Sequence, residues 1–167
     1  PVVTKHHSPV GCWTRTCPAF DLVNKKVVMF KDSWWVSLPD VLPEGETYKL
    51  LMSHKVSNIT SCIAYHNVPP SIPQQSTQTA KFRCAKWASF QSPLTLHTLH
   101  HLVLNIVGKK LTDFKSSCQL TLSVRDALIA HKDTFERAQV LHHDLSVGNI
   151  VIYKGKGYLI DWDLAKL

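Results

Sequence analysis

The 167-residue sequence has no run of the ~18–20 apolar residues that a membrane-spanning helix needs, and no charged-then-apolar secretory signal. Its five cysteines are scattered and never form a Cys-x-x-Cys pair, which argues against a disulfide framework or a four-thiolate zinc site. Acidic residues are few, 12 against 19 lysines and arginines. We therefore expect an intracellular protein of a reducing compartment, with no membrane partner.

The net charge of +7, with histidine neutral, suits a polyanionic ligand such as a nucleotide phosphate, a nucleic acid or an acidic membrane. The basic residues are dispersed rather than interleaved with aromatics, so we expect no nucleic-acid partner. Ten histidines invite a metal hypothesis, above all His97, His100 and His101. Because no cysteine or carboxylate completes a ligand spacing there, we interpret His100 and His101 as residues that flank a strand.

The composition, 44% hydrophobic and 19% charged, is that of one globular domain, and the first half of the chain reads as mainly strands. Residues 26–30 (KVVMF) predict a buried strand that ends at Lys31. Proline followed by acid at 43–44 predicts a helix that continues to residue 52. Residues 59–66 predict a second strand, and the uncharged Pro, Gln, Ser and Thr of 67–80 predict a mobile loop.

The second half combines one long helix with short strands. Residues 102–107 predict a strand that Gly108 stops. Apolar spacing predicts an amphipathic helix over 118–138. Two short apolar segments, 150–153 and 158–160, are separated by the turn sequence KGKG. The fold class expected is therefore α+β.

The residues that carry chemistry lie near the end of the chain. Residues 141–150 (LHHDLSVGNI) contain His-x-Asp and an asparagine five positions after Asp144. A second carboxylate, Asp161, follows a short hairpin in the sequence LIDWD. Phosphoryl transfer uses such a set: Asp144 is the candidate base that accepts the hydroxyl proton, while oxygen atoms of Asn149 and Asp161 are candidate Mg²⁺ ligands.

Residues 141–150 and 159–163 resemble the catalytic loop and metal-binding motif of the protein-kinase superfamily, and in particular of the fungal-type protein kinases. Residues 30–34 (FKDSW) resemble the lysine-bearing strand of that family. Residues 102–114 (LVLNIVGKKLTDF) resemble its hinge strand and the turn that follows. Residues 125–131 (RDALIAH) resemble the helix that leads into the catalytic loop. The resemblance begins near residue 10 and continues to the end of the chain.

The resemblance implies a kinase-like α+β fold in two parts. Residues 10–107 would form a small, β-rich N-terminal lobe with a flexible insertion near 67–80, and residues 108–167 would form the first part of a helical C-terminal lobe. It also implies an ATP- and Mg²⁺-dependent Ser/Thr protein kinase, whose partners are ATP and a protein substrate. The γ-phosphate would pass to a protein hydroxyl.

The resemblance further implies roles for residues outside the catalytic loop. Lys31 would contact the α- and β-phosphates and so joins Asp144 and Asn149 as a catalytic candidate. Glu44 would hold that lysine, with Glu46 as the competing candidate. Leu104 and Ile106, in the segment 104–107, would line the adenine site through backbone donors and acceptors.

The sequence departs from the family pattern in four places. His143 stands where many kinases have arginine, and Asp163 stands where glycine is usual. Gly11 alone remains in the region of the glycine-rich phosphate loop. The chain also stops at Leu167, so we expect a truncated fragment of marginal stability. The apolar side chains expected to remain partly wet are Leu120, Leu128, Leu141, Ile150 and Ile152.

Two other functions remain open. A small-molecule kinase of the aminoglycoside or choline type shares the two motifs, and Ser146, where protein kinases place lysine, favours it. An inactive, pseudokinase-like binding module is favoured by the weak glycine loop and by the early end of the chain.

Overall fold

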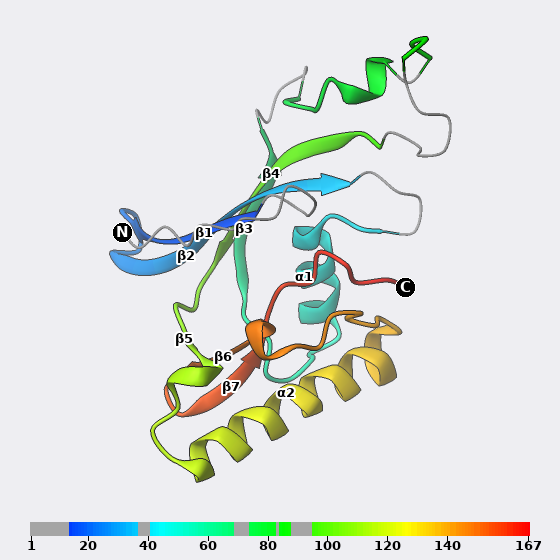
Figure 1. Cartoon of the computed structure of the whole chain (residues 1–167). Coiled ribbons are helices and arrows are strands. Elements are labelled where there is room, and N and C mark those ends of the chain that lie inside the picture. The colour runs from blue at the N-terminus through cyan, green and yellow to red at the C-terminus, as the bar shows by residue number, and fades with distance from the viewer. Residues whose placement is uncertain (1–13, 37–40, 69–73, 83, 88–94) are drawn as a thin grey trace.

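The computed structural model describes residues 14–36, 41–68, 74–82, 84–87 and 95–167. They form two antiparallel sheets and two α-helices, which confirms the α+β class (Figure 1). The larger sheet has four strands in the order β1-β2-β4-β3. Its strands are β1 (Thr14–Asp21), β2 (Lys26–Val36), β3 (Cys62–Asn67) and β4 (His97–Leu104).

The smaller sheet has three strands in the order β5-β6-β7. Its strands are β5 (Lys109–Lys110), β6 (Ile150–Tyr153) and β7 (Lys156–Leu159). Helix α1 (Glu44–Ser53) lies beside the larger sheet, and helix α2 (Ser117–Ala138) lies along the smaller one (Figure 1). Short 3₁₀ turns complete the described elements at Thr79–Phe82, Leu111–Asp113 and Val147–Asn149.

Strand β2 is longer than the sequence predicted. The expected end at Lys31 is wrong, because the strand continues to Val36 and pairs with β4 throughout this extension. Lys31 and Ser33 alternate with less buried neighbours and turn to the covered face of the sheet. The polar residues that seemed to close the strand are therefore its buried central part.

Strand β4 lies earlier in the chain than predicted. The expected strand 102–107 is wrong, since β4 spans His97–Leu104 and residues 105–107 lie outside it. Its polar residues mask a regular alternation, in which Thr98, His100, Leu102 and Leu104 are buried. His100 and His101 consequently sit inside the strand and do not flank it.

Two further strand predictions need correction. Strand β3 begins at Cys62 and not at residue 59. Part of the expected loop 67–80 is hydrogen-bonded to β4: the Leu99 N–H donates to the Gln75 carbonyl at 2.9 Å, and the Thr77 N–H donates to the His97 carbonyl at 2.9 Å. Residues 69–73 lie outside the described part, as do 1–13 with Gly11.

The helices follow the sequence signals closely. Helix α2 confirms the prediction for 118–138, and its first turn is capped by the Ser116 hydroxyl, which accepts from the Gln119 N–H at 3.2 Å. It ends where Gln139 adopts a left-handed conformation with φ of 56°. Helix α1 begins at Glu44, directly after Pro43, as predicted.

Two glycines allow the helices to approach the sheets. A Cβ atom at Gly45 would lie 2.1 Å from the ring of Tyr65 on β3, and one at Gly157 would lie 2.1 Å from the Ser123 carbonyl oxygen of α2. The Gly157 N–H also donates to the buried Asp126 carboxylate at 3.1 Å. Between these contacts lies the main core, which includes Tyr48, Leu51, Leu102, Leu104, Ala127, Ala130, Ile150, Ile152, Leu159 and Trp162.

Candidate functional site

A buried lysine joins the larger sheet, α1 and the end of the chain. Lys31 on β2 is 3% exposed, and its Nζ lies 2.6 Å from the Glu44 Oε2 atom of α1. The same Nζ donates to the Asp161 carboxylate, which follows β7. The second Glu44 oxygen accepts from the Trp162 N–H at 3.2 Å. Three segments distant in the sequence thus meet at one ammonium group.

The charges of this cluster are strongly coupled. Burial alone lowers the pKa of Lys31, but the carboxylates of Glu44, Asp161 and Asp163 outweigh it and raise the pKa well above its ordinary value. Lys31 is therefore an ammonium at neutral pH. Burial raises the pKa of Glu44, while the contact with Lys31 acts in the opposite direction.

The two candidate glutamates of α1 have different contacts. Glu44, at the first position of α1, contacts Lys31. Glu46 lies elsewhere and accepts a hydrogen bond from the Tyr65 hydroxyl at 2.7 Å. Pro43 starts the helix, and the close approach of Gly45 to Tyr65 fixes its position against β3. The first carboxylate of the helix is therefore the one that reaches Lys31.

The loop between α2 and β6 presents the Asp144 carboxylate to solvent. The Asn149 Nδ2 group donates to Asp144 Oδ2 at 2.8 Å and to the Asp144 carbonyl at 2.9 Å. Asn149 itself is 8% exposed, so the amide group that donates these two hydrogen bonds is largely shielded from water. The structure thus brings Asp144 and Asn149 together in one short loop and fixes the orientation of the carboxylate.

His142 supports the same loop from below. Its ring is fully buried against Trp162, with centroids 4.4 Å apart. Nε2 lies 2.9 Å from the Ile160 carbonyl, and Nδ1 lies 3.3 Å from the Asp144 N–H. This pair of partners fits a neutral imidazole that donates from Nε2 and accepts at Nδ1. Burial lowers the pKa of His142, which favours the same neutral form.

The loop and Asp161 are also joined through the backbone. The Ile160 N–H donates to the Asn149 carbonyl at 2.9 Å, which ties the residue before Asp161 to the end of the loop. His143 and Asp161 both have positive φ, 63° and 69°. Non-glycine residues rarely adopt this conformation, and such strain is concentrated at functional sites.

The oxygen atoms available near Lys31 suit Mg²⁺ in type. Asp161 is a carboxylate that is one-third exposed, and the Asn149 carboxamide oxygen accepts no hydrogen bond within the described residues. Mg²⁺ prefers such ligands and usually retains several waters. Within the same part of the chain, no group of three or more His, Cys, Asp or Glu side chains is placed to hold a metal ion by itself.

The segment 104–107 leaves the sheet next to this site. Leu104 ends β4, and its side chain is 5% exposed and part of the main core. The Asn105 N–H donates to the Ser61 carbonyl at 3.0 Å. Ile106 is half-buried, and among the described residues no hydrogen bond involves its backbone N–H or carbonyl. These two groups remain available to a ligand.

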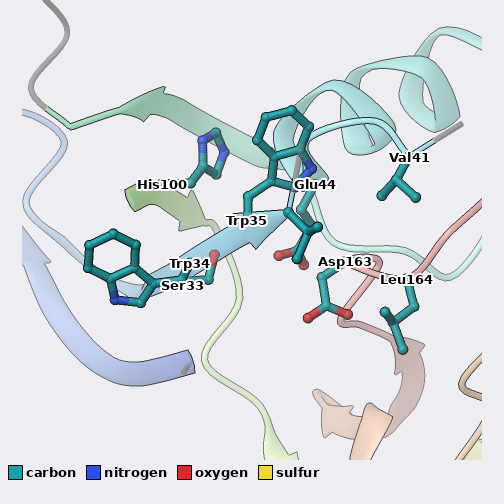
Figure 2. A pocket seen from close by; sticks show the side chains of 9 residues that line it. Ser33, Trp34, Trp35, Val41, Glu44, His100, Asp163 and Leu164 are labelled. Carbon is teal, nitrogen blue, oxygen red and sulfur yellow. The ribbon is translucent and has the colours of Figure 1, made fainter. Parts of the chain in front are cut away.

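A small cavity of about 90 Å³ adjoins Glu44 between the end of β2, α1 and residues 163–164 (Figure 2). Asp163 lies at its edge, and burial, together with Asp161 and Glu44, raises the pKa of Asp163 to about 7 despite Lys31. The buried His100 Nε2 and Trp35 Nε1 atoms, from residues that line the cavity, have no partner among the described residues.

Sequence reasoning missed the support beneath the site. It noted His142 only as part of a motif, and it did not anticipate that Trp162 would bind Glu44 through its backbone N–H. The sequence did contain a signal: His142 lies two positions before Asp144 in an apolar environment, which indicates a buried side chain. The contact between Trp162 and Glu44 spans 118 positions and has no local signal.

Comparison with known families places the chain in the class of protein kinases. The family model for fungal protein kinases matches residues 3–167, so the chain belongs to the fungal protein kinase family. Membership implies a kinase-like phosphotransferase at the level of the family, with the general use of ATP and Mg²⁺. A search of curated proteins gave no match. Within the described residues, no helix is long and apolar enough to cross a membrane.

Proposed function

We propose that this chain carries the nucleotide-binding and proton-accepting residues of an ATP- and Mg²⁺-dependent Ser/Thr protein kinase. The observation that carries the proposal is the buried Lys31 ammonium held between Glu44 and Asp161. A buried charge is costly unless it is paired, and here its two partners come from two other segments, the start of α1 and the residues after β7. A structural ion pair would need only one partner.

Each residue then has a distinct task. Lys31 places a positive charge beside the α- and β-phosphates, and Glu44 positions Lys31. The backbone of Ile106 offers a donor and an acceptor to the adenine edge, next to Leu104. Oxygen atoms of Asn149 and Asp161 would hold Mg²⁺, which would neutralise phosphate charge there.

The transfer step depends on Asp144. This carboxylate is exposed, and Asn149 holds one of its two oxygens. The free carboxylate oxygen of Asp144 accepts the proton of a serine or threonine hydroxyl. At the same time the hydroxyl oxygen bonds to the γ-phosphorus, and the bond from the γ-phosphorus to the ADP oxygen breaks. His142 keeps the Asp144 backbone in place through its Nδ1 atom.

The proposal includes the two-part organisation expected from the family. Residues 10–107 correspond to an N-terminal lobe and residues 108–167 to the beginning of a C-terminal lobe. The larger sheet with α1 and the smaller sheet with α2 support this division. The four described cysteines are free, which supports work in a reducing, intracellular compartment.

The test separates binding from transfer. Titration calorimetry with ATP and Mg²⁺ is expected to show binding that Asp161→Asn strongly weakens, because one metal ligand is lost. Asn is also tolerated at positive φ, so this variant keeps the backbone conformation. Asp144→Asn is expected to retain nucleotide binding and to lose phosphate transfer. Binding that ignores both Mg²⁺ and Asp161→Asn would refute the proposed metal site.

A small-molecule kinase is the second candidate, favoured by Ser146, which follows Asp144 by two positions. Transfer assays with radiolabelled ATP should therefore offer protein acceptors and, separately, aminoglycosides and choline. Turnover of small molecules alone would replace the protein-kinase proposal. Nucleotide binding without any transfer would identify a binding module.

A further inference from the structure

A second cavity lies where the smaller sheet meets the segment that leads into α2. Its volume is about 380 Å³, within the ~300–1,000 Å³ range of ligand sites. Lys109, Lys115 and Lys154 line it, and Asp113 is the one acidic residue among the described residues of its wall. The three lysines and Asp113 do not belong to the site described above, whereas Val107, which also lines the cavity, ends the segment 104–107 of that site.

The wall of this cavity carries a net charge of +2 that nothing neutralises. All three lysines are exposed, and none forms an ion pair within the described residues. Lys154 instead places its Nζ 5.3 Å from the ring centre of Tyr153. Like charges brought together in this way repel, and an anion between them relieves the repulsion.

The backbone that presents the three lysines is firmly held. Lys109 pairs with Ile152 across β5 and β6. Lys154 occupies a tight turn, with φ of 47° followed by 80° at Gly155. The Lys115 N–H donates to the Gln119 side chain at 2.8 Å. Three separate segments thus place lysines around one concavity, on a backbone that is ordered before any ligand binds.

We propose that this cavity binds the phosphate group of a phosphorylated peptide segment of a partner protein. A phosphoserine or phosphothreonine carries nearly two negative charges at neutral pH and has three acceptor oxygens. Such a compact dianion matches a concave wall of net charge +2, whereas a single carboxylate would neutralise only half of it. The site is independent of the proposed phosphotransferase residues.

The experiment measures binding to the 167-residue chain by fluorescence polarisation. The probe is a fluorescein-labelled degenerate peptide library with a fixed central phosphoserine. The control probe is the same library with serine at that position. We expect the serine library to bind at least about tenfold more weakly, because charged hydrogen bonds are lost. An acidic library with glutamate at the centre is expected to fall between the two.

Charge-matched variants locate the site. The triple change Lys109→Gln, Lys115→Gln and Lys154→Gln is expected to weaken binding of the phosphoserine library at least about tenfold. The control replaces Lys25, Lys26 and Lys49 by glutamine, which removes the same charge from exposed positions that do not line the cavity. It should change the affinity by no more than about threefold, since distant charges are screened.

A variant of opposite sign excludes misfolding as the cause. Asp113→Asn removes the one negative charge of the wall and is expected to tighten binding by about two- to fivefold. Equal loss in the two triple variants, equal binding of the phosphorylated and serine libraries, or weaker binding by Asp113→Asn would each overturn the proposal. Displacement of the peptide by ATP and Mg²⁺ would overturn it as well, because the probe would then occupy the nucleotide site.

The same assay keeps this proposal separate from the proposed function. Asp161→Asn, which is expected to abolish Mg²⁺-dependent nucleotide binding, should bind the phosphoserine library as the unmodified chain does. If peptide binding survives while nucleotide binding fails, only the phosphotransferase proposal is lost.

Discussion

Among single residues, Lys31 concentrates the largest electrostatic effects. Its ammonium and the Glu44 carboxylate are both nearly inaccessible, at 3% and 2% exposure. Each charge is stable there only because the other is present. Substitutions of Lys31 and Glu44 can therefore distinguish the contribution of the pair to stability from its role in the proposed nucleotide binding.

Lys31→Met is expected to destabilise the fold by about 3–5 kcal/mol, because it leaves Glu44 buried without its counter-charge. The double variant Lys31→Met, Glu44→Gln should recover a large part of this loss, since the uncompensated carboxylate is gone. Urea denaturation followed by circular dichroism measures both. If the double variant is no more stable than Lys31→Met, burial of Glu44 is not the cause.

The pH dependence of stability tests the buried His100. Burial, with help from His66, His101 and Lys31, lowers the pKa of His100 to about 4 from its ordinary 6.5. The unfolded chain therefore binds this proton before the native state does, so His100 adds stability above pH ~6.5 that is lost as the pH falls towards ~4. The slope is about 1.4 kcal/mol per pH unit.

The measurement compares unfolding free energies of the unmodified chain and of His100→Gln between pH 7 and 4.5. The unmodified chain should lose stability more steeply, because the variant has no imidazole to protonate. His54→Gln, a change at an exposed histidine that is not among the groups acting on the pKa of His100, serves as the control. Parallel curves for His100→Gln and the unmodified chain would show that His100 is not buried in its neutral form.

At the residue scale, local sequence was informative where one loop carries the chemistry. Asp144 and Asn149 are five positions apart, and a shared loop is enough to bring them together. Lys31 and Glu44 were assigned through family resemblance, because the contacts of Lys31 with Glu44 and Asp161 depend on how sheet, helix and terminus pack. Which of Glu44 and Glu46 contacts Lys31 depends on the rotation of α1 about its axis. The sequence does not specify that rotation when the two candidates are so close together.

The elements show a similar division. Helix α2 was predictable because its apolar spacing and its cap are local signals. Strands β2 and β4 were misplaced because Lys31, Ser33, Thr98 and His100 are polar yet buried, so their alternation does not appear in a pattern of hydrophobicity. Two of these side chains have partners on other elements: Lys31 contacts Glu44, and the Asn67 side chain lies 3.0 Å from His100 Nδ1.

The contact between α2 and β7 provides a test at the element scale. Gly157→Ala is expected to cost about 1–3 kcal/mol, because the new methyl group would meet the Ser123 backbone and push the hairpin away from α2. Gly148→Ala is the matched control, since its nearest neighbour would be the Ser146 hydroxyl at an ordinary 3.7 Å. Urea midpoints measure both changes. Similar midpoints for the two variants would contradict the close approach.

For the whole molecule, the expected wet apolar surface is only partly present. Leu128 and Leu141 are exposed, at 51% and 39%, as predicted. Ile150 and Ile152 were predicted to be partly wet, which is wrong: they are 6% and 5% exposed, because β6 pairs on both sides and its inner face packs against the core. The smaller sheet thus completes its own core. Exposed apolar side chains lie on α2 and the loop after it, and also at the β1–β2 turn, where Leu22 and Val23 are 81% and 89% exposed, and at Trp87.

This surface leads to a prediction about association. Leu128 and Phe135 are two turns apart and share one side of α2, with Phe135 49% exposed, while Val147 in the neighbouring loop is 59% exposed. Exposed apolar side chains of this size promote association in water.

The 167-residue chain is therefore expected to self-associate at micromolar concentration. The double variant Leu128→Gln, Phe135→Gln should shift it towards the monomer with little change in unfolding free energy. Light scattering after size exclusion measures the mass, and Lys132→Gln on the same helix is the control. A monomeric unmodified chain with a sharp, cooperative melt would show that this surface needs no cover.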